Sequence, residues 1–151
     1  MKLLSAHFTL AELTRSSIAA RAGIDNTPSP AVIRTLDRLA NEVLEPIREA
    51  VGRPVYVTSG YRSFSVNSMV GGSLNSAHMD GRAADFVVPG MEIHEYSGIV
   101  RLACESLPVG KLIYEFGEWL HVQIEPLGVI PRRIYLSAER GDKGTTYRSW
   151  G

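Results

Sequence analysis

Residues 76–85 read SAHMDGRAAD, and a shorter stretch, WLH, occupies residues 119–121. Together they contain two imidazoles, His78 and His121, and one carboxylate, Asp85. A glycine between His78 and Asp85 allows a turn that runs into a strand, so both side chains can face one point. Three protein ligands with a fourth position left for water are typical of catalytic zinc, whereas structural zinc sites are usually closed by four ligands. The pattern therefore predicts a metal centre built from two separate parts of the chain.

Each histidine taken alone has an ordinary structural explanation. His121 lies in an apolar strand pattern, where most histidines are hydrogen-bonded core residues, and His78 lies in a polar segment typical of surface loops. Asp80 is interpreted as a turn residue, and His7 and His94 have no partners at metal-ligand spacing. The metal prediction rests on the combined pattern of both histidines with Asp85.

The composition indicates one soluble globular domain. The chain has 151 residues, and its 16 Lys and Arg residues balance 16 Asp and Glu residues. A formal net charge of zero gives no electrostatic signature of a partner such as nucleic acid or an anionic membrane. The single cysteine, Cys104, excludes an internal disulfide and is expected to be a buried, inert thiol. We expect a monomer without membrane insertion.

Helices are predicted mainly in the first third of the chain. Thr9 and Glu12 fit a capping box for a short helix from Leu10 to about Arg15. The segment 16–30 is polar and is predicted to be mostly loop. A long helix is expected from Pro30 to about Val51, with Pro46 inside it as a kink or an early end. Its buried stripe recurs every three or four residues: Val32, Leu36, Leu39, Val43 and Ile47.

The rest of the chain is predicted to be mostly strands. Strands are expected at 55–59, 85–88, 112–116 and 119–124, with a loop over 61–76, a helix over 92–107 and a last strand or helix edge over 132–138. The short link at Gly117 and Glu118 suggests a hairpin. This order predicts an α+β fold in which a small, mostly antiparallel sheet packs against helices. The whole chain, 1–151, is taken as a single domain with a core over about 8–138 and a polar, irregular tail after 139.

The two stretches together resemble the zinc D-Ala-D-Ala carboxypeptidase family. The matching pattern is Ser-x-His-x-x-Gly-x-Ala-x-Asp at 76–85 followed by Trp-x-His at 119–121. Upstream, residues 59–62 are similar to the family's Ser-Gly-Tyr-Arg segment, and residues 8–13 resemble the opening of its phage-type members. The family also includes vancomycin-resistance dipeptidases and shares a fold with the hedgehog signalling domain. The resemblance covers about residues 8–138 and implies a hedgehog-like peptidase fold.

The resemblance implies one Zn²⁺ per chain, with His78, Asp85 and His121 as its ligands. A general base is also needed, and two glutamates compete for that role. Glu118 lies three residues before His121, as in the carboxypeptidase branch, and Glu115 lies six before it, as in the hedgehog-like branch. Glu118 would have to curl back from the turn. Glu115 reaches the face of His121 only if the hairpin loop has an odd number of residues, which would pair it across from His121.

Four further residues are implied in substrate binding or catalysis. Arg62 is expected either to hold a substrate carboxylate or to stabilise a developing oxyanion. Ser76 is a candidate hydrogen-bond partner of the substrate, with a loop cap as its structural alternative. Tyr61 and Trp119 are candidates for lining the cleft, with a place in the core as the alternative for each.

The expected function is a zinc-dependent peptidase that hydrolyses a bond in the stem peptide or cross-link of peptidoglycan. The bond itself is left open among D-Ala-D-Ala, L-Ala-D-Glu and a D-Ala cross-link. The N-terminal segment has no signal-peptide pattern, so we expect synthesis in the cytoplasm and action on the cell wall after release, as a phage lysis enzyme or virion component. The alternatives are a non-catalytic zinc-containing wall-binding module and an intracellular D,D-dipeptidase.

Overall fold

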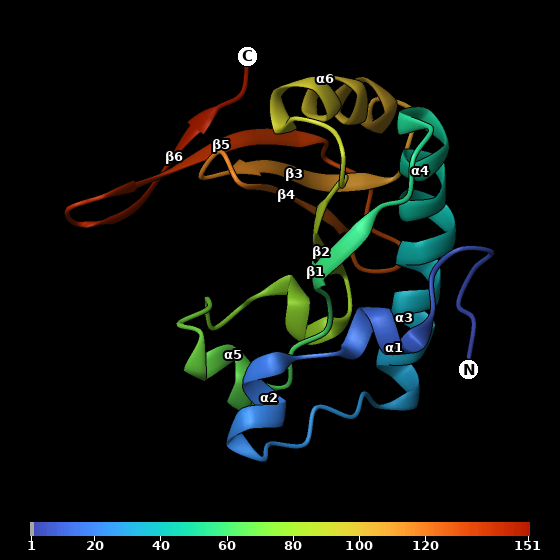
Figure 1. The fold of residues 1–151 in the computed structure, drawn as a ribbon, viewed down its shortest axis with the longest axis vertical. Coiled ribbons are helices and arrows are strands. Elements are labelled where there is room, and N and C mark those ends of the chain that lie inside the picture. The colour runs from blue at the N-terminus through green and yellow to red at the C-terminus, as the bar shows by residue number, and fades with distance from the viewer. Residues whose placement is uncertain (1) are drawn as a thin grey trace.

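The computed structural model describes residues 2–151 and has helices packed against one six-stranded sheet (Figure 1). The strand order is β1-β2-β4-β3-β5-β6. All neighbouring strands are antiparallel except β3 and β5, which are parallel. The predicted α+β class with a mostly antiparallel sheet is confirmed.

The helices lie on one side of the sheet and around its β1 edge. Their bounds are α1 Leu10–Thr14, α2 Ser17–Ala22, α3 Pro30–Leu39, α4 Glu45–Val51, α5 Phe64–Met69 and α6 Ile93–Cys104. A 3₁₀ turn, η2, covers Ala77–Asp80. Thr9 is the N-cap of α1, as predicted: its hydroxyl accepts a hydrogen bond from the Glu12 amide at 3.1 Å and donates to Glu12 Oε1 at 3.1 Å. Figure 1 shows α6 lying across the sheet, where it contacts β3 and α4.

The long helix predicted from Pro30 to Val51 is present with a local change of winding. Ala40–Leu44 forms a π-helical segment between α3 and α4, and Pro46 lies in the first turn of α4. A proline inside a helix lacks an amide donor and clashes with the carbonyl four residues before it. We attribute the wider turn before Pro46 to this clash. The apolar stripe keeps its register, and Leu36, Leu39, Val43 and Ile47 are fully buried.

The strands are β1 Tyr56–Ser59, β2 Ala83–Val87, β3 Val109–Glu115, β4 Trp119–Ile124, β5 Ile134–Gly141 and β6 Gly144–Ser149. β3 and β4 form the predicted hairpin, but its loop has three residues, 116–118, because Glu115 pairs with Trp119. Phe116 and Gly117 both have positive φ in this loop. The odd loop length puts Glu115 on the face of His121, although Ile113, and not Glu115, lies directly across from His121.

The sheet has one apolar face and one polar face. Along β4, Leu120, Val122 and Ile124 belong to the main core, while His121 and Gln123 alternate with them and point the other way. In β2, Ala84 and Phe86 enter the same core on either side of Asp85. The metal-site residues therefore share their strands with core residues.

Three segments predicted to be irregular are ordered. The segment 16–30 contains α2, capped by the Ser16 hydroxyl, and the segment 61–76 contains α5, capped by Ser63. Both helices have only six residues, fewer than two turns, which is too short to show a helical period. The expected irregular tail after 139 was wrong, because β5 continues to Gly141 and β6 pairs with it.

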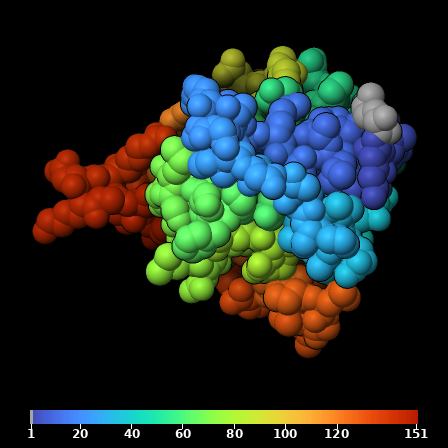
Figure 2. All heavy atoms as spheres, turned by 90° about the horizontal axis from the view of Figure 1, so that it is seen from below, coloured from blue at the N-terminus to red at the C-terminus, as the bar shows by residue number. Residues whose placement is uncertain are grey.

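The hairpin of β5 and β6 projects from the body of the molecule (Figure 2). Every residue of β6 is exposed, so its sequence carries no alternation of apolar and polar residues. The chain returns to the core after β6, where Trp150 packs against it. Within residues 2–151, no helix combines the length and apolar character that a bilayer span requires.

Candidate metal centre

His78 is held by the turn that precedes β2. The Ser76 hydroxyl accepts a hydrogen bond from the His78 amide at 3.2 Å and caps the 3₁₀ turn. Gly81 ends this turn with φ of 77°, and a side chain there would also press on Val32 and Leu36. His78 as a whole residue is 2% exposed. The motif glycine is thus required both by its backbone angle and by the close approach of α3.

The ring of His78 is oriented from behind by a backbone carbonyl. Its Nδ1 lies 2.7 Å from the oxygen of Gly60, and because a carbonyl only accepts, Nδ1 carries the proton and donates. Nε2 then faces Asp85, 3.3 Å from Oδ1. A side chain at residue 60 would overlap the carbonyl oxygen of Leu13, so only glycine fits there. The Ser-Gly-Tyr-Arg segment therefore supports the metal centre directly.

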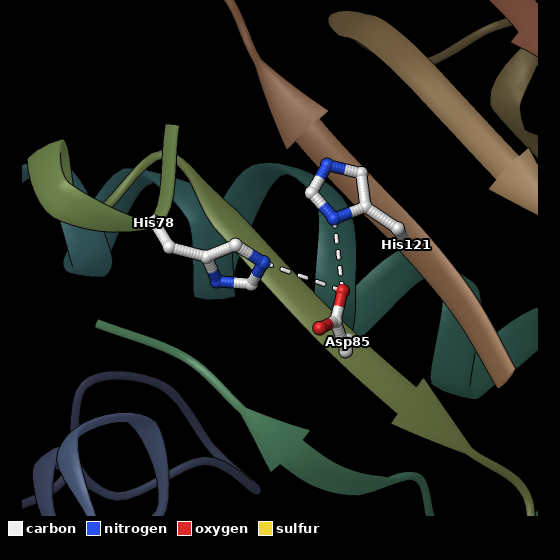
Figure 3. Close-up of side chains that lie close together, drawn as sticks. All are labelled: His78, Asp85 and His121. Atoms are coloured by element: carbon white, nitrogen blue, oxygen red, sulfur yellow. Dashed lines mark hydrogen bonds and ion pairs between the residues drawn. The ribbon is translucent and has the colours of Figure 1, made fainter. Parts of the chain in front are cut away.

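Asp85 and His121 are brought together by strand pairing. They are partners in the register of β2 and β4, and His121 Nδ1 lies 2.8 Å from Asp85 Oδ1. On the far side of the ring, His121 Nε2 donates to Gln123 Oε1 at 2.8 Å. Figure 3 shows both imidazoles pointing at the same carboxylate oxygen from different elements. One ring nitrogen of each histidine faces the carboxylate, and the other is engaged by a hydrogen-bond acceptor.

The charges of these three residues favour a cation between them. Burial would raise the pKa of Asp85, but the two histidines outweigh it and hold that pKa far below its ordinary range, so the carboxylate is ionised. Burial lowers the pKa of His78. Burial also acts to lower the pKa of His121, yet its hydrogen bond to Asp85 and the charge of Asp85 raise it overall. The ionised carboxylate thus attracts positive charge at the point where the three side chains meet.

The three side chains fit a metal ion by number, type and spacing. One potential ligand atom from each of His78, Asp85 and His121 lies within 4.8 Å of the other two. Two imidazoles and one carboxylate are ordinary ligands of a transition metal. Metal-ligating histidines usually donate their second N–H to a carbonyl or similar acceptor, as both do here to Gly60 and Gln123.

Of the two candidate bases, Glu115 is the one beside this group. Its Oε1 lies 3.7 Å from His121 Nδ1 and accepts a hydrogen bond from the Trp119 indole at 3.2 Å. Burial and the charge of Asp85 raise the pKa of Glu115, while His121 and the Trp119 hydrogen bond act to lower it, with a net increase. Glu115 is thus a mostly buried carboxylate with a fixed orientation.

Glu118 lies in the hairpin loop and away from the metal group. Its side chain is 55% exposed and pairs with Arg140 Nη1 at 2.7 Å. It is not among the residues that line the cleft. The three-residue loop is the reason, because Glu118 is its last residue, directly before β4, and its side chain does not turn back toward His121.

An open cleft of about 330 Å³ gives access to His78, His121 and Glu115. Arg62 enters it from the loop after β1, where its amide donates to the His78 carbonyl at 3.1 Å. Burial lowers the pKa of Arg62, and the charges of Asp85 and Glu115 oppose this change. Its Nε is buried, and no hydrogen-bond partner for it is found among residues 2–151. The guanidinium is therefore a cation beside the metal group with a donor to spare.

The remaining predicted binding residues divide between the cleft and the core. Ser76 caps the turn of His78, as its structural alternative had it, and it also lines the cleft. Tyr61 packs against the hydrophobic core. Trp119 stacks edge-on against Phe116 and orients Glu115, so its contact with the site is through the glutamate. Neither Tyr61 nor Trp119 belongs to the cleft lining.

The sequence reasoning missed several residues of the cleft. Gln123 was detectable, since it lies two positions after His121 and alternation puts both on one face of β4. Lys111 was detectable in the same way, because it lies four positions before Glu115 on β3 and alternation puts both on one face. Tyr147 reaches the cleft from β6. No local sequence pattern predicts that the C-terminal segment returns to the site.

Comparison with known proteins found one matching family and a similar enzyme. A family model described as Peptidase M15 matches residues 6–123, which include the whole metal group and both glutamates. The zinc D-Ala-D-Ala carboxypeptidase of Streptomyces albus G is 40% identical over 80 residues. That alignment covers 52% of this chain and 30% of the relative, so the chain spans about a third of the length of the protein it matches.

Proposed function

The chain belongs to the peptidase M15 family, and from this premise we propose that it is a zinc-dependent peptidase that hydrolyses a peptide bond in peptidoglycan. One observation carries the proposal. His78, Asp85 and His121 converge on one point, with Glu115 beside them and Arg62 in the same open cleft. A non-catalytic zinc module has no need of a buried, oriented carboxylate and an accessible cleft next to its metal.

We assign His78, Asp85 and His121 as the ligands of a single Zn²⁺. The ligand set matches catalytic zinc sites, in which three protein side chains leave one coordination position open. The name of the Streptomyces relative supports zinc among the metals that this donor set accepts. Bound there, Zn²⁺ would supply Lewis acidity that polarises the scissile carbonyl and makes a water molecule acidic enough to attack it.

Glu115 is the general base in this proposal. Its Oε1 accepts the proton of the attacking water and later returns that proton to the amine that leaves. The Trp119 indole holds the same oxygen, which fixes the carboxylate toward His121 instead of toward solvent. The place of Glu118 in the loop and its pairing with Arg140 argue against the same role for it.

Arg62 and Ser76 position the substrate. The Arg62 guanidinium offers planar donors to a carboxylate of the peptide or to the oxyanion that develops at the carbonyl carbon. The Ser76 hydroxyl accepts from the His78 amide and has its own hydrogen left to donate into the cleft. Neither residue needs to move to reach the cleft, since both already line it.

We propose peptidoglycan as the substrate because of the relative's name, which specifies a D-Ala-D-Ala carboxypeptidase. The finer proposal is a cell-wall enzyme of the lysis or virion-associated type, acting as a carboxypeptidase or an endopeptidase. It is supported by the similarity of residues 8–13 to phage-type members. An open cleft also suits a chain segment better than a free dipeptide, which an enclosed pocket would surround more completely.

The test is digestion of purified peptidoglycan by the zinc-loaded protein, with released amino groups and peptide fragments measured by mass spectrometry. We expect cleavage that a chelator abolishes and added Zn²⁺ restores. Cleavage unaffected by the chelator would refute the zinc mechanism, and no cleavage of any peptidoglycan would favour the binding module. Hydrolysis of free D-Ala-D-Ala, with intact cross-linked peptidoglycan left uncut, would instead identify a dipeptidase.

A further inference from the structure

The cleft continues past the metal group onto the far strands of the sheet. In this part its lining includes Lys111 and Ile113 of β3 and Tyr147 of β6. β6 lies beyond residue 123, where the family match ends. This part of the cleft is thus built partly by a hairpin that the family comparison does not cover.

Strand register explains how β6 reaches the cleft. Glu115 of β3 pairs with Ala138 of β5, and Ala138 pairs with Tyr147 of β6, so the three side chains lie in one row on one face. Two strand spacings separate Glu115 from Tyr147, roughly 10 Å between their backbones. The residue between them is an alanine, too small to close the gap. Burial and the charge of Glu115 raise the pKa of Tyr147, in keeping with a shared space.

Two features of this region point to a ligand. Tyr147 is 53% exposed although it is a large aromatic residue at the edge of a cleft. Lys111 is partly exposed in the same cleft, opposite Gln123, and forms no salt bridge with any residue in the described range 2–151. A free ammonium beside an exposed phenol offers charge, hydrogen bonding and an apolar surface together.

The charge of the cleft selects the kind of ligand. Arg62 and Lys111 balance the carboxylates of Asp85 and Glu115, so a bound divalent metal leaves the cleft net positive. Arg62 and Lys111 approach from different walls, one from the loop after β1 and one from β3. Two separate cations suit a peptide that carries more than one carboxylate. Stem peptides of peptidoglycan have this chemistry because they contain acidic residues besides their C-terminal carboxylate.

We propose that Lys111 and Tyr147 form a second substrate subsite, which binds a carboxylate on an acidic residue of the stem peptide. Lys111 supplies the charge, and Tyr147 supplies the wall and a hydrogen bond. This inference rests on the proposed function, because it names the part of the peptidoglycan that the same cleft takes. It gives the C-terminal hairpin a role in selecting substrate and none in the chemistry at the metal.

The test is a calorimetric titration of zinc-loaded protein with two synthetic stem tetrapeptides. One has free carboxylates on its glutamate and diaminopimelate residues, and in the other both are amides. We expect the wild type to bind the acidic peptide roughly tenfold more tightly, the effect of one hydrogen bond between charged groups. Lys111→Gln should lose that preference. Lys143→Gln is the matched control, since it removes the same charge from the exposed turn of the hairpin.

Equal affinities of the wild type for the two peptides would overturn the subsite, as would a preference that survives in Lys111→Gln. Tyr147→Ala should weaken binding of both peptides severalfold, with Arg148→Ala, on the opposite face of β6, as its control. Unchanged binding by Tyr147→Ala would remove the hairpin from the subsite. The recovered peptides and a sample of peptidoglycan are then checked for cleavage. A protein that discriminates the peptides but cuts nothing would contradict the proposed function and leave the subsite standing.

Discussion

The two faces of the sheet are made from the same strands but have different roles. One face packs in the hydrophobic core, and the other carries the residues of the metal centre. On β4, Leu120 and Val122 are fully buried in the core, and His121 between them faces the metal centre. On β2, Phe86 enters the core and its neighbour Asp85 faces the same centre. Alternation along a strand means that the packing of one face sets the backbone positions on which the other face depends. The backbone positions of the metal-site residues are therefore set by the core that packs behind them.

The largest effect is expected from the cleft face. His121→Ala removes one of the three proposed ligands, so we expect bound zinc and peptidoglycan cleavage both to be lost, while the protein stays folded. Zinc content by atomic absorption and circular dichroism measure the two outcomes. Full zinc occupancy in this variant would show that His121 is not a ligand.

The next effect separates two residues of the same hairpin. Glu115→Gln should lower the cleavage rate about 10²–10⁴-fold, as expected for loss of a general base, with zinc retained. Glu118→Gln is the control, because it changes the same group in the exposed loop. Rates are measured on peptidoglycan with zinc-loaded protein. Equal, mild losses in both variants would mean that neither glutamate is the base.

A substitution on the core face should lower the stability of the fold and leave zinc binding in place. Leu120→Ala removes a fully buried side chain next to His121, and we expect a loss of about 2–5 kcal/mol in the free energy of unfolding. The fraction that remains folded should still bind zinc, because His121 keeps its partners. Urea denaturation and zinc content are the measurements. If Leu120→Ala lost its zinc but kept the urea midpoint of the wild type, the two faces would not have the separate roles proposed here.

The smallest effect is expected at a residue that supports a ligand. Gln123→Leu removes the acceptor at His121 Nε2, and loss of such a partner typically weakens metal binding about 10–100-fold. Competition with a chromophoric chelator measures the zinc affinity. Gln123 is half-buried and lies on the cleft face, outside the hydrophobic core, so the unfolding free energy should change much less than in Leu120→Ala.

Much of this arrangement was predictable from local patterns. The stripe from Leu36 to Ile47 and the strand over residues 119–124 each repeat within a few residues, so the sequence indicates which side chains are buried. The motif glycine between His78 and Asp85 predicted a turn into a strand, and the structure has one. The fold class and the grouping of His78, Asp85 and His121 were both expected. The short helices α2 and α5 were missed because six residues make fewer than two helical turns and carry too little periodicity.

The amino-acid sequence by itself determined the candidate ligands, the two candidate bases and the helical stripe. Only the tertiary structure showed that Glu115, and not Glu118, lies beside the metal group, because that placement depends on whether the loop of the hairpin has an odd or even number of residues. It alone revealed the Gly60 carbonyl behind His78 and the return of β6 to the cleft. Ligand type and alternation are local properties of the chain. The side on which a distant strand pairs is set by contacts between residues far apart in sequence, which no short motif records.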